Sequence, residues 1–315
     1  MDVDTRDLLR DSIQQLLASD GADLVAGLAE LGWEEVVSDY PADAVDLFFT
    51  EQGRAGRAST YLDSVLLDAA GGDLRQPLTV IHPIGDAMCL ELEGRMVIDG
   101  VTLTDVQSTR GCVIAVDGAE ATAHLVDPDR LAKATTPVAG FDPDSLLHRV
   151  RIEVSMSDTE PCLCDWRGAI AAGRRALASE LVGNGSAMLD IAIDHVRQRT
   201  QFGRPIGTNQ TPRHRLAECH VQLAGARGLM DTAWQSGSPW DAWVAKTYAG
   251  YASDTTSRTC LQVCGAIGLT SEHVLGGYAK RARVLDALYG GWRASVQDIG
   301  MTLLRRETIP AGPLL

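Results

Sequence analysis

Residues 199–207 read RTQFGRPIG, and this turn-like stretch separates two long segments with helical periodicity. The apolar residues that share one helical face before it are Leu177, Leu181, Met188, Ala192 and Val196. After it, an alternating spacing of three and four residues joins Leu216, Cys219, Leu223, Ala226, Met230 and Ala233. Because residues three and four apart lie on the same side of an α-helix, the pattern predicts two long helices joined by a short connection. We expect Leu216, Leu223 and Met230 to be buried between helices.

Start and stop signals extend this helical pattern toward the end of the chain. Pro212 lies in the first turn of the second helix and Pro239 opens the next, positions that suit a residue without a backbone N–H. Residues 262–268, with the sequence QVCGAIG, contain the glycines that end that helix. Long helices joined by short loops are typical of a bundle. We therefore predict a bundle of roughly four or five helices over residues 156–315.

The rest of the chain divides into a helical segment and a β segment. Residues 1–74 show helical spacing, with helices expected to begin at Asp4 and Thr5 and to cover residues 22–31 and 42–55, the last interrupted by Gly53. Short apolar runs bounded by Gly, Pro and Asp predict a small antiparallel unit over residues 75–155. Its expected strands are 78–81, 87–92, 96–98, 112–116 and 121–125, and residues 135–145 are expected to form a loop. The predicted fold is mainly α with a small central β domain.

Composition and charge exclude several classes of protein. The chain has 315 residues, of which 45% are hydrophobic and 22% charged, so it is neither a disordered tail nor a fibre. Its net charge of −14 repels phosphate backbones and anionic lipid, and we expect no nucleic-acid or membrane partner. No stretch approaches the roughly 20 apolar residues of a membrane span, and the first residues are acidic. We expect a soluble, cytoplasmic protein.

The cysteines indicate free thiols. There are seven, an odd number, which argues against a complete set of disulfides. The pairs Cys162 with Cys164 and Cys260 with Cys264 could in principle bind a metal ion. No neighbouring His or Cys completes a four-ligand set at zinc spacing, so we expect no metal site.

Taken together in their order, the two glycine-containing stretches resemble the C-terminal helical domain of the acyl-CoA dehydrogenase family. The first resembles the family's RxQFGxPI box, Gln210 stands where the family has a glutamine eight residues after the phenylalanine, and QVCGAIG resembles its QxxGGxG box. The resemblance covers residues 165–305. Residues 28–33 and 53–67 also resemble the family's N-terminal helical domain, so the implied architecture is helical domain (1–74), reduced β domain (75–155) and helical bundle (156–315).

In the family these boxes bind FAD across a subunit interface. The resemblance implies that they hold the ADP half of the FAD seated in the neighbouring subunit. It places Arg199 on the pyrophosphate and Phe202 on the flavin side, with Gln201 as a further candidate in the same box. The residues implied near the adenosine end are Gln210, Gln262, Gly265 and Ala266, the last replacing a family glycine. An arginine beside exposed amides at a helix end is itself an anion site.

The family's catalytic features are missing from this sequence. Residues 75–155 lack the family's motifs for the walls of the flavin and acyl-CoA site. The family's two alternative positions for the catalytic carboxylate are occupied by Gly290 and Gly173, and glycine cannot remove a proton. Glu180 follows Gly173 by two helical turns, about 10 Å along the axis, too far to replace it. Asp286, one turn before Gly290, is similarly displaced, so we assign no catalytic residue.

The absences make the chain resemble the small, flavin-site-deficient subunits of actinobacterial heteromeric steroid-CoA dehydrogenases, which combine two large and two small chains. The implied partner is a larger subunit that carries the catalytic glutamate and most of the acyl-CoA site, with electron-transfer flavoprotein as acceptor. The implied reaction introduces an α,β double bond into an acyl-CoA thioester.

Two alternatives stay open at this point. The chain could be a self-sufficient flavoenzyme, an oxidase or oxygenase, on the same fold, or a non-catalytic assembly protein. For single residues, Phe202 could be a core side chain, Arg199 a solvated helix-end charge, and residues 262–268 an ordinary helix stop.

Overall fold

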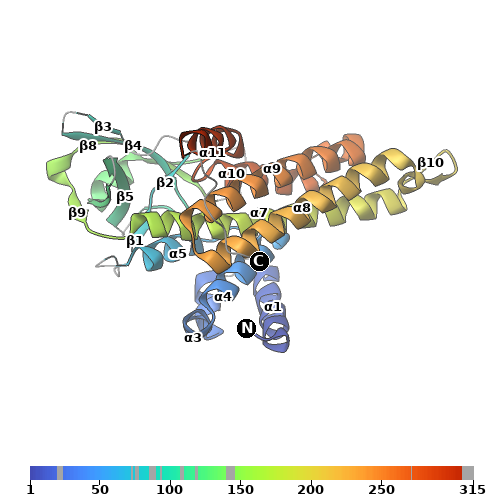
Figure 1. Cartoon of the computed structure of the whole chain (residues 1–315), viewed down its shortest axis with the longest axis horizontal. Helices are drawn as coiled ribbons and strands as arrows, with labels where there is room; N and C mark the ends of the chain where they lie inside the picture. Colours follow the sequence, from blue (N-terminus) through green and yellow to red (C-terminus); the bar gives the residue numbers. More distant parts are fainter. Residues whose placement is uncertain are drawn as a thin grey trace.

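The computed structural model describes residues 1–19, 24–71, 74, 78–84, 90–92, 94–106, 110–117, 120–139, 146–270 and 272–306. Helices lie before and after a β-stranded middle segment (Figure 1). The predicted class, mainly α with a small central β unit, is confirmed. None of the helices in this part of the chain combines the length and the apolar character that a membrane crossing requires.

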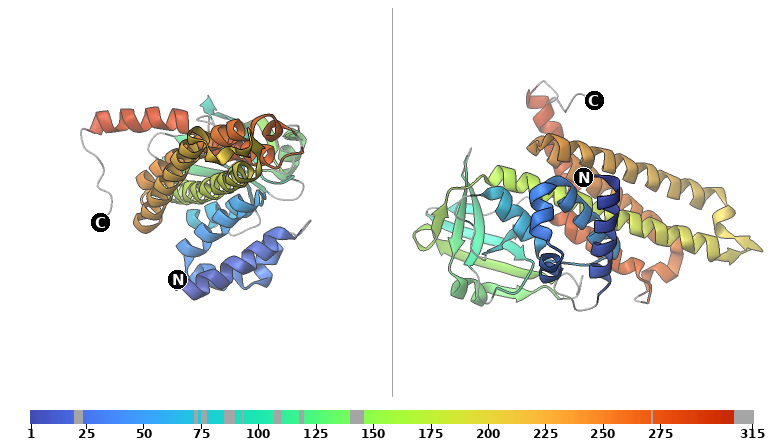
Figure 2. Two further views of the ribbon diagram at one scale, coloured as in Figure 1. Left: turned by 90° about the vertical axis from the view of Figure 1, so that its right-hand side faces the viewer. Right: turned by 90° about the horizontal axis from the view of Figure 1, so that it is seen from below.

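The N-terminal helices form a layer on one side of the bundle (Figure 2). They are α1 (Val3–Ala18), α2 (Leu24–Glu30), α3 (Trp33–Asp39), α4 (Pro41–Ala55) and α5 (Tyr61–Ala70). Asp2, rather than the expected Asp4 and Thr5, caps α1, because its carboxylate accepts a hydrogen bond of 2.9 Å from the Thr5 N–H. The helix expected over residues 22–31 is α2; its first two expected positions lie outside the described residues.

The C-terminal bundle is built as the periodicity predicts. Its helices among the described residues are α7 (Trp166–Gln198), α8 (Gln210–Ser236), α9 (Pro239–Cys264), α10 (Leu275–Ala287) and α11 (Trp292–Arg306). Leu216, Leu223 and Met230 are all buried, which confirms the predicted apolar stripe of α8. Pro239 occupies the first turn of α9, and the Ser238 hydroxyl before it accepts the Asp241 N–H.

Two glycines allow α4 to lie directly against α7. A Cβ atom at Gly53 would lie 2.1 Å from the Glu180 carbonyl oxygen, and one at Gly183 would lie 2.0 Å from the Thr50 carbonyl oxygen. Neither position can carry a side chain at this helix spacing. The sequence predicted an interruption at Gly53, and this was wrong: α4 continues through it, because the glycine serves close packing rather than a turn.

The β segment forms two small sheets. The first has the order β1-β5-β6-β9 and the second the order β2-β4-β8-β7, with β3 paired to β4. The strands are β1 (Leu78–Val80), β2 (His82–Pro83), β3 (Leu90–Leu92), β4 (Arg95–Thr102), β5 (Arg110–Asp117), β6 (Glu120–Val126), β7 (Thr135–Pro137), β8 (His148–Ser155) and β9 (Glu160–Cys162).

Three details of this segment differ from the sequence expectations. β1 and β5 are parallel, whereas an antiparallel unit was expected. Part of the expected 135–145 loop is β7, which pairs with β8, and α6 (Pro128–Ala134) precedes it. β9 pairs with β6 beyond the expected boundary at residue 155. Pairings between strands distant in sequence depend on long-range packing that local apolar runs do not encode. Residues 87–89 and 140–145 of the expected elements lie outside the described residues.

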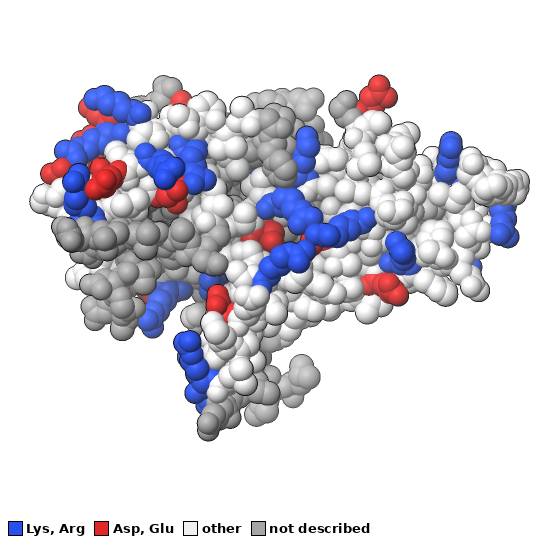
Figure 3. All heavy atoms as spheres, turned by 90° about the horizontal axis from the view of Figure 1, so that it is seen from above, with Lys and Arg blue, Asp and Glu red and all other residues white. Residues whose placement is uncertain are grey.

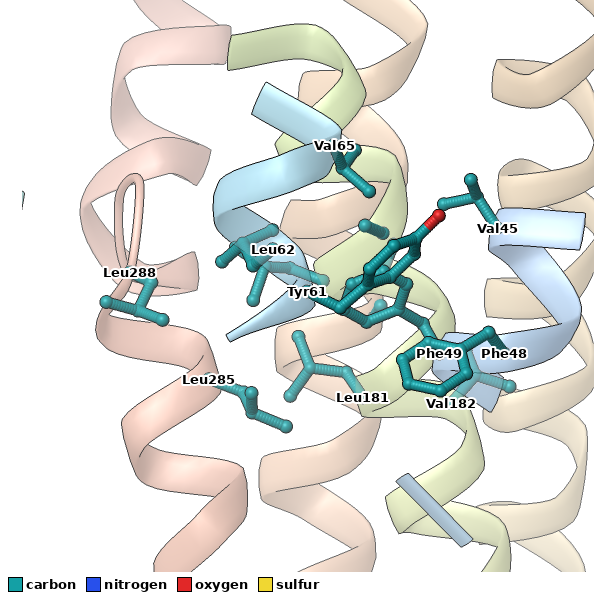
Figure 4. Packing of buried hydrophobic residues seen from close by; sticks show 14 of the residues in the cluster. Val45, Phe48, Phe49, Tyr61, Leu62, Val65, Leu181, Val182, Leu285 and Leu288 are labelled. Atoms are coloured by element: carbon teal, nitrogen blue, oxygen red, sulfur yellow. The ribbon is translucent and has the colours of Figure 1, made fainter. Parts of the chain in front are cut away.

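One apolar core joins the N-terminal layer to the bundle, and Figure 4 shows its centre. The aromatic rings of Phe48, Phe49 and Tyr61 contact one another at centroid distances of 5.1–5.9 Å. They lie beside Leu181 and Val182 of α7. A separate, smaller core fills the β segment. The N-terminal helices therefore belong to the same packed body as the bundle, and this body fixes the positions of the residues considered next.

Candidate functional site

The RTQFGRPIG stretch forms an exposed hairpin at one end of the bundle. Arg199 ends α7, and the short strands β10 (Thr200–Gln201) and β11 (Arg204–Pro205) pair across Phe202 and Gly203. Phe202 has a φ of 52° and Gly203 a φ of 78°, the two positive values that a tight two-residue hairpin turn requires. The Phe202 side chain is 99% exposed. It is therefore not a core residue of this chain.

The remaining predicted cofactor residues lie at the same end of the bundle. Gln210 is the first residue of α8, Gln262 lies in the last turn of α9, and Gly265, with a φ of 68°, follows the end of that helix. Ala266 belongs to the 3₁₀ turn η4 (Gly265–Leu269). All seven predicted cofactor residues are exposed, and the turns that carry them meet where α7 and α9 end and α8 begins (Figure 1).

This end of the molecule suits an anion. The Asn209 side chain precedes α8 but accepts a hydrogen bond from Arg204 at 2.8 Å, and it makes no side-chain cap to the helix. The first N–H groups of α8, at the positive end of its dipole, therefore lack that usual partner. A groove of about 670 Å³ lies alongside, and Arg197, Arg213 and His220 are among its lining residues. Basic groups thus gather here on a chain with a net charge of −14.

The two positions where the resemblance implies a catalytic carboxylate are glycines with close neighbours. A Cβ atom at Gly173 would lie 2.9 Å from Cδ2 of Leu66 on α5, so this leucine side chain would have to shift to admit a larger residue. Gly290 has a φ of 100°, and a Cβ atom there would lie 3.0 Å from the Ser295 hydroxyl oxygen. At position 290 the backbone conformation itself favours glycine, whereas at position 173 a side chain requires a shift of Leu66.

The nearby carboxylates are held by structural partners. Glu180 is 2% exposed, and its Oε1 accepts hydrogen bonds of 3.1 and 2.7 Å from the Arg281 guanidinium. Asp286 accepts a hydrogen bond of 3.1 Å from the Trp292 N–H at the start of α11. Burial raises the pKa of Asp286, although Lys246 opposes this, with its Nζ 3.8 Å from the carboxylate. Each carboxylate therefore stabilises a junction between helices.

Lys246 fixes the loop that carries Gly290. Its side chain is fully buried in α9, and its Nζ donates hydrogen bonds to the carbonyl oxygens of Asp286, at 2.5 Å, and of Gly290. Burial lowers the pKa of Lys246 to about 8.

A cavity of about 300 Å³ lies beside the loop that carries Gly290, and its described lining residues are apolar apart from Arg149 and Arg283. That lining offers no carboxylate to remove a proton.

The sequence did not predict a buried series of hydrogen bonds that lies next to Gly290. His82 of β2 contacts Asp63 of α5 through Nε2 at 2.7 Å and the Tyr289 hydroxyl through Nδ1 at 3.0 Å. With Nε2–H donating to the carboxylate, Nδ1 accepts from the tyrosine. The three side chains are buried and connect the N-terminal layer, the β segment and the bundle. No sequence spacing could indicate these hydrogen bonds, because His82 is 19 residues from Asp63 and 207 residues from Tyr289.

Arginines also converge on a buried acid of the upper face. Arg258, Arg283 and Arg293 all contact the Asp254 carboxylate. Figure 3 shows basic side chains gathered around acidic ones in the middle of this face. One buried carboxylate thus holds α9, α10 and the start of α11 together.

The chain thus combines a C-terminal helical bundle, two small sheets and an exposed hairpin with positive φ values. Residues 166–302 match the family model "Acyl-CoA dehydrogenase, C-terminal domain". This part of the chain is therefore an acyl-CoA dehydrogenase C-terminal domain, as the two boxes predicted.

Curated relatives carry the same family name. The protein called acyl-CoA dehydrogenase IpdE2 from Mycobacterium tuberculosis is 28% identical over 239 residues, which cover 69% of this chain and 74% of that one. Its namesake from Mycolicibacterium smegmatis is 31% identical over 137 residues, or 44% of each chain.

Solved structures share the whole fold. A variant of the Tcur3481–Tcur3483 steroid ACAD superposes with a TM-score of 0.75 at 19% identity, covering 96% of this chain and 99% of that one. A chain of the ChsE4–ChsE5 complex from Mycobacterium tuberculosis gives a TM-score of 0.69 at 20% identity, covering 98% and 96%. At these identities the likeness establishes the fold.

Proposed function

We propose that this chain is the small subunit of a heteromeric acyl-CoA dehydrogenase, in which it binds part of the FAD seated in a larger partner and supplies no catalytic base. One observation carries the proposal. Both positions where the resemblance implies a base are glycines here, one of them with a φ of 100°, while all seven predicted cofactor residues are exposed together at one end of the bundle. A self-sufficient enzyme needs a carboxylate at one of these positions. A partner subunit needs only the exposed cofactor residues.

The residues at this end of the bundle fit a dinucleotide. Arg199 and the uncapped N–H groups of α8 would hold the pyrophosphate, and Gln201 would lie beside them. A Cβ atom at Gly265 would meet no heavy atom within 4 Å, so the space beside this turn is open. Gln210, Gln262, Gly265 and Ala266 would contact the adenosine end. Phe202 would cover the flavin side.

The proposed reaction introduces an α,β double bond into an acyl-CoA thioester. When bound, FAD accepts the hydride from the β carbon. In our proposal the partner's glutamate removes the α proton, and this chain binds, orients and shields the cofactor.

We also infer a steroid-derived substrate, since the structural neighbours include a steroid ACAD. Electron-transfer flavoprotein is the proposed acceptor.

Expression with and without a larger subunit tests the proposal. The chain should be produced alone and together with a full-length acyl-CoA dehydrogenase encoded beside it. The co-purified complex should contain one FAD per pair of large and small chains and should oxidise acyl-CoA. The chain alone should purify without stoichiometric flavin. If it is yellow, stoichiometrically loaded and active by itself, it is the self-sufficient flavoenzyme instead. A stable complex without any flavin would favour the assembly protein.

A further inference from the structure

Three side chains with metal-binding atoms converge where the bundle's helix ends meet. His195 lies in the last turn of α7, Cys264 is the last residue of α9, and His273 lies just before α10. One ligand atom of each residue lies within 4.8 Å of the other two. From this cluster we propose that His195, Cys264 and His273 bind a Zn²⁺ ion.

The donor set suits zinc. Imidazole nitrogen and thiolate sulfur are its usual ligands, and sites with three protein ligands leave the fourth position to water or another group. Zinc–ligand bonds of about 2.0–2.3 Å place tetrahedral ligand atoms roughly 3.3–3.7 Å apart. The present separations, within 4.8 Å, therefore require only a small closure of the side chains.

The surroundings give the ion both a fixed ligand and a route of access. Cys264 is 7% exposed, and a Cβ atom at Gly268 would lie 3.0 Å from its Cβ, so the turn after α9 folds tightly over the thiol. His195 and His273 are both partly exposed.

Zinc binding would remove one hydrogen bond at the start of α10. Nδ1 of His273 accepts the Leu275 N–H at 3.2 Å, at the start of α10. A metal on either ring nitrogen removes this acceptor, because the metal occupies Nδ1 or leaves Nδ1 protonated. The ion therefore replaces a helix-start contact with a bridge between three segments. This bridge joins the helix that leads into RTQFGRPIG to the helix that ends in QVCGAIG.

The sequence expectation of no metal site rested on local spacing. Cys264 is near His273 in the sequence, but His195 is far upstream and reaches them only because α7 and α9 end together. The inference does not depend on the proposed function. Zinc can be measured on the full chain whether or not FAD or a partner binds.

Metal titration of the full chain tests the site. After removal of metal with a chelator, the chain should be titrated with Zn²⁺ in competition with a chromogenic chelator, and with Co²⁺ as a spectroscopic substitute. We expect one ion per chain, a cobalt–thiolate charge-transfer band, and a higher melting temperature with zinc. Cys264→Ser and His195→Gln should each weaken zinc binding at least about tenfold, since even losing an outer-shell contact costs about 10–100-fold.

Matched variants keep the test specific. Cys260→Ser removes another buried thiol one turn earlier on α9, and His214→Gln removes an exposed histidine of α8. Both should bind zinc like the parent, with circular dichroism confirming that every variant is folded. The proposal is overturned if the folded parent binds no zinc, if Cys264→Ser binds it equally well, or if the cobalt complex lacks the thiolate band.

Discussion

A carboxylate at position 290 would have to extend from a backbone with a φ of 100° and past the Ser295 hydroxyl. Only glycine adopts such a backbone without strain. At position 173 a Cβ atom would lie 2.9 Å from Cδ2 of Leu66, so that side chain would have to shift. A carboxylate at either position would therefore require its neighbour to move, and at position 290 it would add backbone strain.

Replacing Gly290 by glutamate should destabilise the chain without creating dehydrogenase activity. Strain at a positive φ costs about 1–3 kcal/mol, and the close Ser295 oxygen adds to it. Denaturant unfolding measures the change. Gly277→Glu is the control, because a Cβ atom there meets no heavy atom within 4 Å and its helical φ is ordinary. A stable Gly290→Glu chain that dehydrogenates acyl-CoA by itself would contradict this account.

Replacing Arg199 by alanine should weaken FAD retention in the complex. A charge-assisted hydrogen bond contributes about 1.5–3 kcal/mol, which corresponds to roughly a tenfold to hundredfold loss of FAD affinity. Flavin content after dialysis reports the loss. Arg151→Ala serves as control, since that arginine lies on β8 and is 80% exposed. Equal flavin retention in both variants would count against binding across the subunit interface.

At the scale of elements, the long helices were predictable and the contacts between distant segments were not. The spacing in α8 identified its buried stripe because that information is local to one helix. The parallel pairing of β1 with β5 and the chain from Asp63 through His82 to Tyr289 depend on segments far apart in sequence. The two boxes were recognisable as short motifs. The space around Gly173 could be learned only from where α5 lies.

The junction between α9 and the Gly290 loop should give the chain a distinct pH dependence. The pKa of Lys246 is about 8 in the folded chain and near 10.5 when unfolded. Between these values the unfolded chain holds more protons, so the contribution of Lys246 to stability rises with pH, by at most on the order of 3 kcal/mol. Tyr61 and Cys260 act oppositely, because burial raises their pKa values.

A comparison with Lys246→Met isolates this effect. The difference in unfolding free energy between parent and variant should shift in favour of the parent as the pH rises from about 8 to 10.5. Urea unfolding at several pH values measures it. A difference that is constant over this range would mean that Lys246 holds its proton equally well in the folded and the unfolded chain, so that burial does not lower its pKa.

At the scale of the whole molecule, one end of the bundle presents apolar side chains together with the predicted cofactor residues. Phe202, Ile267, Leu269 and Val274 are all exposed there. Apolar groups gathered on a surface commonly mark a protein interface. In the proposed complex, a partner that covers this end would bury these side chains together with the dinucleotide.

In such a complex, removing carboxylates from this chain should leave turnover nearly unchanged. Glu180→Gln and Asp286→Asn should alter kcat by no more than a few-fold, because Glu180 is paired with Arg281 and Asp286 accepts the Trp292 N–H. Replacing the partner's glutamate should abolish turnover. Steady-state kinetics on complexes with equal flavin content measures all three. A loss of about 10²–10⁴-fold from either variant of this chain, as expected for a general base, would show that the small subunit takes part in the proton transfer after all.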